Sequence, residues 1–141
     1  MAGKSAAKAG RGRRSAPEPR GELAIRTLAM PADTNPSGDI FGGWVMAQMD
    51  IAGGITAAAR AKGRVATVAV TGFSFHRPVR VGDVVCCYAD IRKVGTTSIT
   101  IHIEAWVTRR RESQARFKVT EGVFTFVALD DKGNKRKVPP A

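Results

Sequence analysis

The feature that most constrains the fold is a long proline-free stretch, residues 41–61, which is rich in alanine and methionine. This composition favours an α-helix, and apolar side chains fall on nearly all of its sides, so the helix is expected to be buried on most sides. Gly53 and Gly54 would each cost about 1 kcal/mol relative to alanine inside a helix, and are expected where the backbone approaches a neighbour closely. Loops alone cannot bury such a helix, so a larger apolar surface must surround it.

Segments on both sides of this helix alternate apolar and polar residues, the pattern of half-buried β-strands. Residues 31–38, before the helix, are dense in turn formers and are expected to be a loop. A curved antiparallel sheet of about five to six strands, wrapped around one long central helix, is the simplest arrangement that buries both, and this is the α+β hotdog fold. A two-fold dimer would cover a free edge of that sheet. The expected strands are residues 22–30, 64–75, 83–94, 97–109 and 117–129.

The chain length fits a single domain, residues 21–141, preceded by a basic arm, residues 1–20. The arm has no hydrophobic period and is expected to be disordered. It holds six basic residues against one acidic residue, and so carries +5 of the net charge of +11. Such arms are usually solvated, so nucleic acid is not the expected partner, although polyanion contact and a transit-peptide role both stay open. The absence of a long apolar run and of a secretory signal predicts a cytoplasmic protein without a membrane partner.

Few residues are suited to metal or nucleophilic chemistry. Cys86 and Cys87 are adjacent in a strand, where neighbouring side chains point to opposite faces, and are expected to be reduced packing residues. His76 and His102 do not sit in a metal-spaced cluster, so no metal site is expected, and His102 is expected at the surface or at an interface. No serine nucleophile elbow is present. The three arginines at residues 109–111 are expected to form a solvated loop.

Asp50 is an ionisable residue among the apolar side chains of the helix. Burial disfavours the charged carboxylate and raises its pKa toward values that suit a general base. Such a residue is costly unless it is paired or functional. An aspartate that bonds a backbone group or another partner, with a purely structural role, stays an alternative.

Gly42 and Gly43 lie where the first helical turn exposes unpaired N–H groups, which could stabilise an oxyanion or could simply ease the turn into the helix. Asp50 follows Gly43 by two helical turns, about 10 Å along the axis, so one subunit does not readily place both at one atom. Asn35 precedes a proline, as turn residues often do, but its amide could also donate to a carbonyl or position a water.

The motif around these residues resembles that of the acyl-CoA hydrolase branch of the hotdog thioesterases, and most closely the bacterial YciA-type enzymes. Residues 33–44 read DTNPSGDIFGGW and are followed by the triplet QMD at residues 48–50. The resemblance covers about residues 22–139 and leaves only the basic arm unexplained. Further matching segments are RVATVAV at 64–70, PVRVGDVV at 78–85, KVG at 93–95 and VFTFVA at 123–128.

The resemblance implies hydrolysis of acyl-CoA thioesters to a free acid and CoA, with no cofactor, because CoA is part of the substrate. It implies that Asp50 is the catalytic aspartate and that Asn35 assists it from the opposite subunit of a homodimer. The amides around Gly42 and Gly43 would polarise the thioester carbonyl. A trimer of dimers, a hexamer, is the expected assembly.

For the CoA nucleotide, the resemblance points to the region after Phe75 and to the turn at residues 93–98. The candidate binding residues are Arg77, Arg80, Lys93, Thr97 and Ser98. Relatives often have a basic residue followed by serine where this chain has Thr96 and Thr97. This departure affects the expected nucleotide affinity more than the expected chemistry.

Two mechanisms and several other functions stay open at this point. Asp50 could activate water as a general base, or attack the thioester to form a mixed anhydride. A hotdog dehydratase would use a helix histidine, and residues 41–61 contain none. A non-catalytic acyl-CoA sensor would bind CoA without hydrolysis. Nucleic-acid binding through residues 1–20 would be steeply salt-dependent and lost when those residues are deleted.

Overall fold

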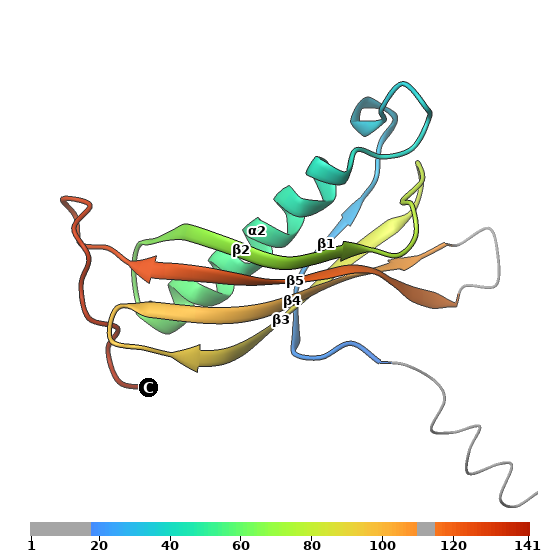
Figure 1. The fold of residues 1–141 in the computed structure, drawn as a ribbon. Coiled ribbons are helices and arrows are strands. Elements are labelled where there is room, and N and C mark those ends of the chain that lie inside the picture. Colours follow the sequence, from blue (N-terminus) through green and yellow to red (C-terminus); the bar gives the residue numbers. More distant parts are fainter. Residues whose placement is uncertain (1–17, 110–114) are drawn as a thin grey trace, which may run out of the picture.

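The computed structural model describes residues 18–109 and 115–141 of the chain, so the predicted disorder of the arm lies almost wholly outside the described residues. One long helix lies across one face of an antiparallel sheet (Figure 1). The strand order in the sheet is β1-β3-β4-β5-β2. The elements in chain order are β1 (Glu22–Leu28), a 3-10 helix η1 (Pro31–Asp33), α2 (Gly42–Ala61), β2 (Val65–Phe75), β3 (Val84–Val94), β4 (Ser98–Thr108) and β5 (Arg116–Ala128).

The predicted hotdog arrangement is confirmed, because a curved five-stranded antiparallel sheet packs against one long helix. Each strand and the helix lie within about two residues of the expected bounds, since alternating and helical periods mark them clearly. The loop predicted at residues 31–38 contains the short η1 turn.

The core lies between one stripe of α2 and the inner face of the sheet. Val45, Met49 and Ala52 of α2 are buried against this face, to which Ile101 and Ile103 of β4 belong. The close approach expected at the glycine pair is confirmed at Gly53, where an added Cβ would lie 2.5 Å from Cδ1 of Ile103. It is wrong at Gly54, where an added Cβ would meet nothing within 4 Å among the described residues.

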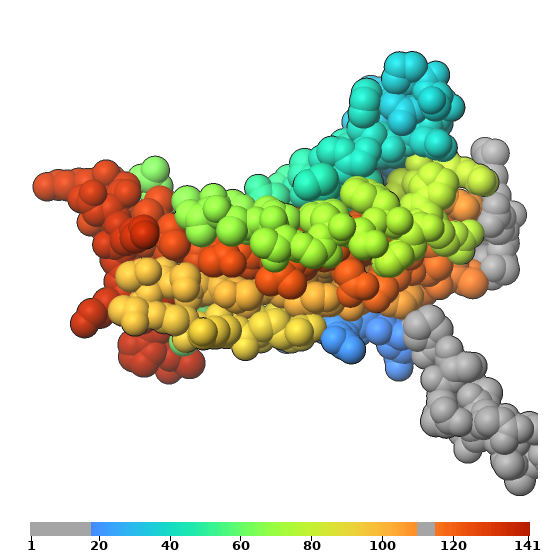
Figure 2. Space-filling model, in the orientation of Figure 1, coloured from blue at the N-terminus to red at the C-terminus, as the bar shows by residue number. Residues whose placement is uncertain are grey.

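Only one side of α2 is buried, so the expectation of burial on most sides is wrong for a single chain. Ile51 and Ile55 are 50% and 51% exposed, because the sheet covers the helix from one direction only. Ile55 lines a pocket with residues of β1, whereas β2 is an edge strand on the other side of the sheet and pairs only with β5 among the described strands. Figure 2 shows the β2 side chains uncovered along the front of the molecule, and Val68 is 55% exposed.

Two predicted surface groups are buried. Arg109, expected in a solvated loop, is buried, and its Nε and Nη2 donate to Oδ1 and Oδ2 of Asp83 at 2.9 and 2.8 Å. Such a bidentate pair keeps a guanidinium in place at the end of β4. Residues 110 and 111 lie outside the described residues. His102, expected at the surface or an interface, is only 7% exposed on the sheet face away from α2.

The cysteines are packing residues, as predicted. Cys86 and Cys87 are both buried and both free. Burial, reinforced by the neighbouring Cys86, raises the pKa of Cys87 to about 12. The Cys87 thiol is therefore protonated and unreactive in the folded protein at neutral pH. Among the described residues, no helix is both long and apolar enough to cross a membrane.

Candidate active site

Asp50 lies half-buried on α2, next to the start of β2. Thr67 of β2 donates a hydrogen bond from Oγ1 to Oδ1 of Asp50 at 2.6 Å. Asp50 therefore has a hydrogen-bond partner, which agrees with the alternative in which this aspartate has a structural role. An ionised carboxylate has about four acceptor positions, so this one bond leaves capacity to bind and deprotonate a water.

The first turn of α2 is open toward solvent. The N-cap residue Phe41 makes no side-chain cap, and its carbonyl oxygen accepts the N–H groups of Trp44 and Val45 at 3.0 and 3.3 Å. The N–H groups of Gly42 and Gly43 come before this bonding begins, at the positive end of the helix dipole. An added Cβ at Gly42 would lie 3.4 Å from the ring of Phe75, whereas one at Gly43 would meet nothing within 4 Å among the described residues.

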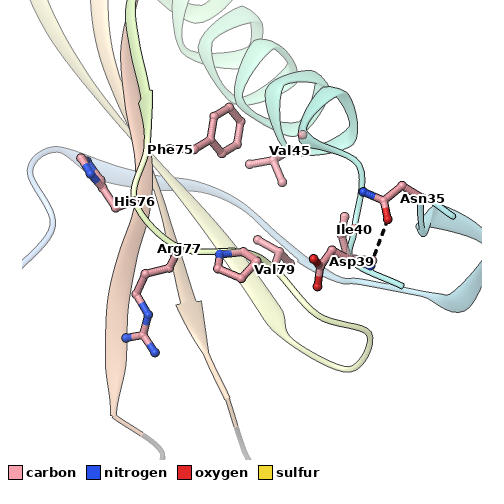
Figure 3. Close-up of a pocket in the computed structure, with 10 residues that line it drawn as sticks. Asn35, Asp39, Ile40, Val45, Phe75, His76, Arg77 and Val79 are labelled. Atoms are coloured by element: carbon pink, nitrogen blue, oxygen red, sulfur yellow. Dashed lines mark hydrogen bonds between the residues drawn. The ribbon is translucent and has the colours of Figure 1, made fainter. Parts of the chain in front are cut away.

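Asn35 forms the turn that its position before proline predicts. Its Oδ1 accepts hydrogen bonds from the N–H groups of Ser37 and Asp39 at 2.9 and 3.2 Å. Because the amide oxygen is held in this way, the NH₂ group is fixed on the other side. Figure 3 shows this nitrogen directed toward the start of α2, on the side of Val45. Asn35 can therefore form the turn through its Oδ1 and still donate a hydrogen bond from its NH₂ group.

Asn35 and the start of α2 border a cleft of about 340 Å³. The cleft brings together Asn35, Gly42 and Arg77 of the predicted site residues (Figure 3). Asp50 and Gly43 are not part of its lining. The cleft that Asn35 and Gly42 border therefore does not include the Asp50 carboxylate. The lining residues are Asn35, Asp39, Ile40, Gly42, Val45, Phe75, His76, Arg77, Pro78 and Val79.

The predicted CoA-binding residues fall into two groups. Arg77 and Arg80 lie between β2 and β3, and the guanidinium of Arg77 stacks 3.6 Å above the ring of Phe117. The other group, Lys93, Thr97 and Ser98, lies at the β3–β4 hairpin, at the opposite end of the sheet (Figure 1). One chain does not bring these two groups together.

The sequence reasoning missed two neighbours of the proposed chemistry. Thr67, the partner of Asp50, carries no signal in the sequence, because its contact depends on how β2 packs beside α2. His76 lines the cleft beside Arg77, and its position directly after the β2 strand pattern is the only signal that could have indicated it.

Comparison with known proteins gives a consistent assignment. A family model of the thioesterase superfamily matches residues 37–114. The acyl-CoA thioester hydrolase YciA of Salmonella typhimurium is 58% identical over 123 residues, which cover 86% of this chain and 92% of the relative. The solved hexameric thioesterase of Yersinia pestis is 58% identical with a TM-score of 0.84, covering 88% of this chain and 100% of that one. The aspartate-to-alanine variant of a hexameric broad-specificity acyl-coenzyme A thioesterase is 52% identical with a TM-score of 0.82, covering 85% and 88%.

Proposed function

Because this chain belongs to the thioesterase superfamily, we propose that it hydrolyses acyl-CoA thioesters to a free acid and CoA. The proposal is supported by the identity with YciA over nearly the whole length of that relative. The observation that carries it furthest is the half-buried Asp50 carboxylate, held by Thr67 beside an unpaired strand edge. No cofactor is needed, since water and the thioester are the only reactants.

The active unit in this proposal is a homodimer formed through β2. Its edge is unpaired among the described strands, and the exposed apolar residues Val68 and Val70 lie on it. A two-fold axis that pairs β2 antiparallel with its own copy sets the beginning of one strand against the end of the other. Thr67 and Asp50 then face the cleft at the end of the partner's β2. Asp50 thereby meets Asn35 of the partner subunit.

Each proposed site combines groups from both chains. Asp50 removes a proton from a water, which attacks the thioester carbonyl carbon. The N–H groups of Gly42 and Gly43 stabilise the negative charge that develops on the carbonyl oxygen, and the Asn35 amide donates to the same centre. The C–S bond then breaks, and the CoA thiolate takes up the proton that Asp50 removed from the water. In the alternative route, Asp50 attacks the carbonyl itself and water hydrolyses the resulting mixed anhydride.

The two groups of CoA-binding candidates fit an assembly larger than one chain. Arg77 and Arg80 on one subunit, and Lys93 with the hydroxyls of Thr97 and Ser98 on another, would bind the phosphates and the adenosine of one CoA molecule. The solved relatives described above are hexamers, which supports a trimer of dimers here. Mass measurement in solution tests the assembly directly.

The proposed activity is tested by measuring thiol release from acyl-CoA substrates of graded chain length. Hydrolysis of at least one substrate, abolished in Asp50→Ala while folding and CoA binding persist, is the expected result. CoA binding by the wild-type chain without any thiol release would refute the enzyme and favour an acyl-CoA sensor. Label found in the Asp50 carboxylate after a single turnover in ¹⁸O-labelled water identifies the anhydride route with attack of water on the Asp50 carbonyl, because general-base catalysis places the label in the product acid alone.

A further inference from the structure

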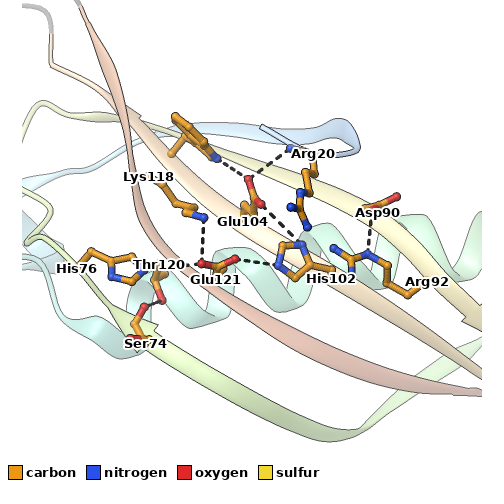
Figure 4. Close-up of polar contacts among 11 residues, drawn as sticks. Arg20, Ser74, His76, Asp90, Arg92, His102, Glu104, Lys118, Thr120 and Glu121 are labelled. Carbon is orange, nitrogen blue, oxygen red and sulfur yellow. Dashed lines mark hydrogen bonds and ion pairs between the residues drawn. The ribbon is translucent and has the colours of Figure 1, made fainter. Parts of the chain in front are cut away.

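A polar cluster lies on the sheet face opposite α2, and His76 of the cleft lies 3.8 Å from one of its members, Glu121. His102 and Glu104 of β4 share this face, because Ile101 and Ile103 between and beside them point into the helix-side core. The register of β4 and β5 places Glu121 directly opposite Glu104. Figure 4 shows the imidazole of His102 between these two carboxylates. Three potential metal ligands from two strands thus converge at one point.

The position of the His102 ring is fixed from one side. Nε2 of His102 lies 3.0 Å from Oε1 of Glu121. Lys118 Nζ pairs with the other oxygen, Oε2, of Glu121 at 2.9 Å, so this carboxylate faces a cation on one side and the His102 ring on the other. The Glu121 carboxylate is therefore an acceptor, and Nε2 of His102 is the donor that carries a hydrogen.

The other ring nitrogen has no such partner. Nδ1 of His102 is buried and makes no hydrogen bond among the described residues. It faces Oε2 of Glu104 at 3.8 Å, too far for a hydrogen bond. Glu104 is itself only 3% exposed. Its other oxygen, Oε1, accepts hydrogen bonds from Trp106 Nε1 at 2.8 Å and from the backbone N–H of Arg20 at 3.3 Å. Two electron-rich atoms therefore face each other in a buried place.

We propose that His102 Nδ1 and Glu104 Oε2 are ligands of a divalent transition-metal ion, with zinc as the best fit. Zinc binds imidazole nitrogen and carboxylate oxygen at about 2.0–2.2 Å, so an ion between the two atoms bridges a separation of up to roughly 4.3 Å. The observed 3.8 Å lies within that limit. Imidazole combined with carboxylate favours zinc over calcium or magnesium, which take oxygen ligands.

The surroundings of both ligands match those of a metal site. A metal-bound histidine usually donates its second ring N–H to a carboxylate, and Glu121 occupies that position. Trp106 and Arg20 hold the non-ligating oxygen of Glu104 in the same manner. Glu121 stays the acceptor for the Nε2–H group, and water completes the coordination around the ion. The ion would join β4, β5 and the segment before β1.

Zinc binding to the full-length protein tests this proposal without reference to hydrolysis. The protein is freed of metal with EDTA and titrated with zinc chloride in a calorimeter. One zinc per chain is expected for the wild type. Binding should be lost in Glu104→Gln and weakened roughly 10–100-fold in Glu121→Gln, as for other groups that orient a metal ligand. The matched control Asp131→Asn, which alters an exposed carboxylate in a distant turn, should bind as the wild type does.

A second measurement removes any dependence on how the Glu104 variant folds. The chain has two histidines, so in His76→Gln the remaining imidazole belongs to His102. Zinc should then shift the ¹⁵N resonance of Nδ1 far more than that of Nε2. Absence of zinc binding in the wild type, unchanged binding in Glu104→Gln, or an unshifted Nδ1 resonance in the saturated protein would each overturn the proposal.

Discussion

Thr67 of β2 donates a 2.6 Å hydrogen bond to Asp50 of α2, and so joins the helix to the edge strand at the proposed catalytic carboxylate. Thr67→Val keeps the shape of the side chain and removes the donor. We expect kcat/KM to fall roughly tenfold, which corresponds to about 1.4 kcal/mol, because Asp50 loses the contact that fixes its orientation. Steady-state thiol release measures the change. Thr71→Val on the same strand is the control, and an equal loss in both variants would contradict a specific role for Thr67.

The proposed division of each site between two chains predicts complementation. Asp50→Ala and Asn35→Ala should each be inactive as homodimers. After the two variants are unfolded together and refolded as a mixture, half of the dimers are mixed, and each mixed dimer has one site with both wild-type residues. About one site in four should then be active. A mixture that stays as inactive as its components would place Asp50 and Asn35 in the same subunit's site.

The contrasting surroundings of the glycine pair predict opposite effects on folding. In Gly53→Ala the new methyl group would lie 2.5 Å from Cδ1 of Ile103 and 2.7 Å from Cζ of Phe126. Overpacking of this kind costs about 1–3 kcal/mol of unfolding free energy. Gly54→Ala meets no atom within 4 Å among the described residues, and should gain up to about 1 kcal/mol from helix propensity. Urea unfolding of the two variants compares them directly, and equal stabilities would refute the packing argument.

The lowered pKa of Glu121 predicts a dependence of stability on acid pH. The carboxylate is held in its charged form by Lys118 and His102, so its pKa in the folded chain lies below the ordinary value of 4.5. Its contribution is present in full above that ordinary value and disappears as the pH falls through the folded pKa. Glu121→Gln should therefore lower the unfolding free energy at neutral pH and flatten its acid dependence. Denaturant unfolding in EDTA at several pH values measures this, and parallel curves for the two proteins would exclude the effect.

Much of the fold is predictable from local sequence patterns. The strand and helix bounds follow from periods of two and 3.6 residues, and the loop at residues 31–38 follows from its turn formers. The exposure of Ile51 and Ile55 cannot be predicted from the sequence. An apolar residue gives the same sequence pattern whether its own sheet covers it or it stays exposed in the single chain. The burial of Arg109 depends on Asp83, a residue far along the chain.

The candidate site is also only partly predictable from the sequence. Asp50, Asn35 and the Gly42–Gly43 pair stand in one short motif, and the structure places Asn35 and Gly42 on one cleft. Thr67 reaches Asp50 only through the packing of β2 beside α2. His102 and Glu104 meet Glu121 only through the register of β4 with β5, so the expectation of no metal site rested on ligand spacing along the chain and could not include this cluster.

The uncovered edge of β2 also bears on how the protein is made in a cell. Among residues 18–109 and 115–141, the β2 edge has an unpaired row of backbone groups beside apolar side chains, which another extended chain can engage. In the proposed dimer, pairing with a sister chain therefore competes with aggregation from the moment of synthesis. Rapid overproduction raises the concentration of newly made chains whose strand edges are still unpaired, and so favours aggregation. Yield of the native assembly should accordingly rise when synthesis is slowed, even though the stability of the finished protein is unchanged.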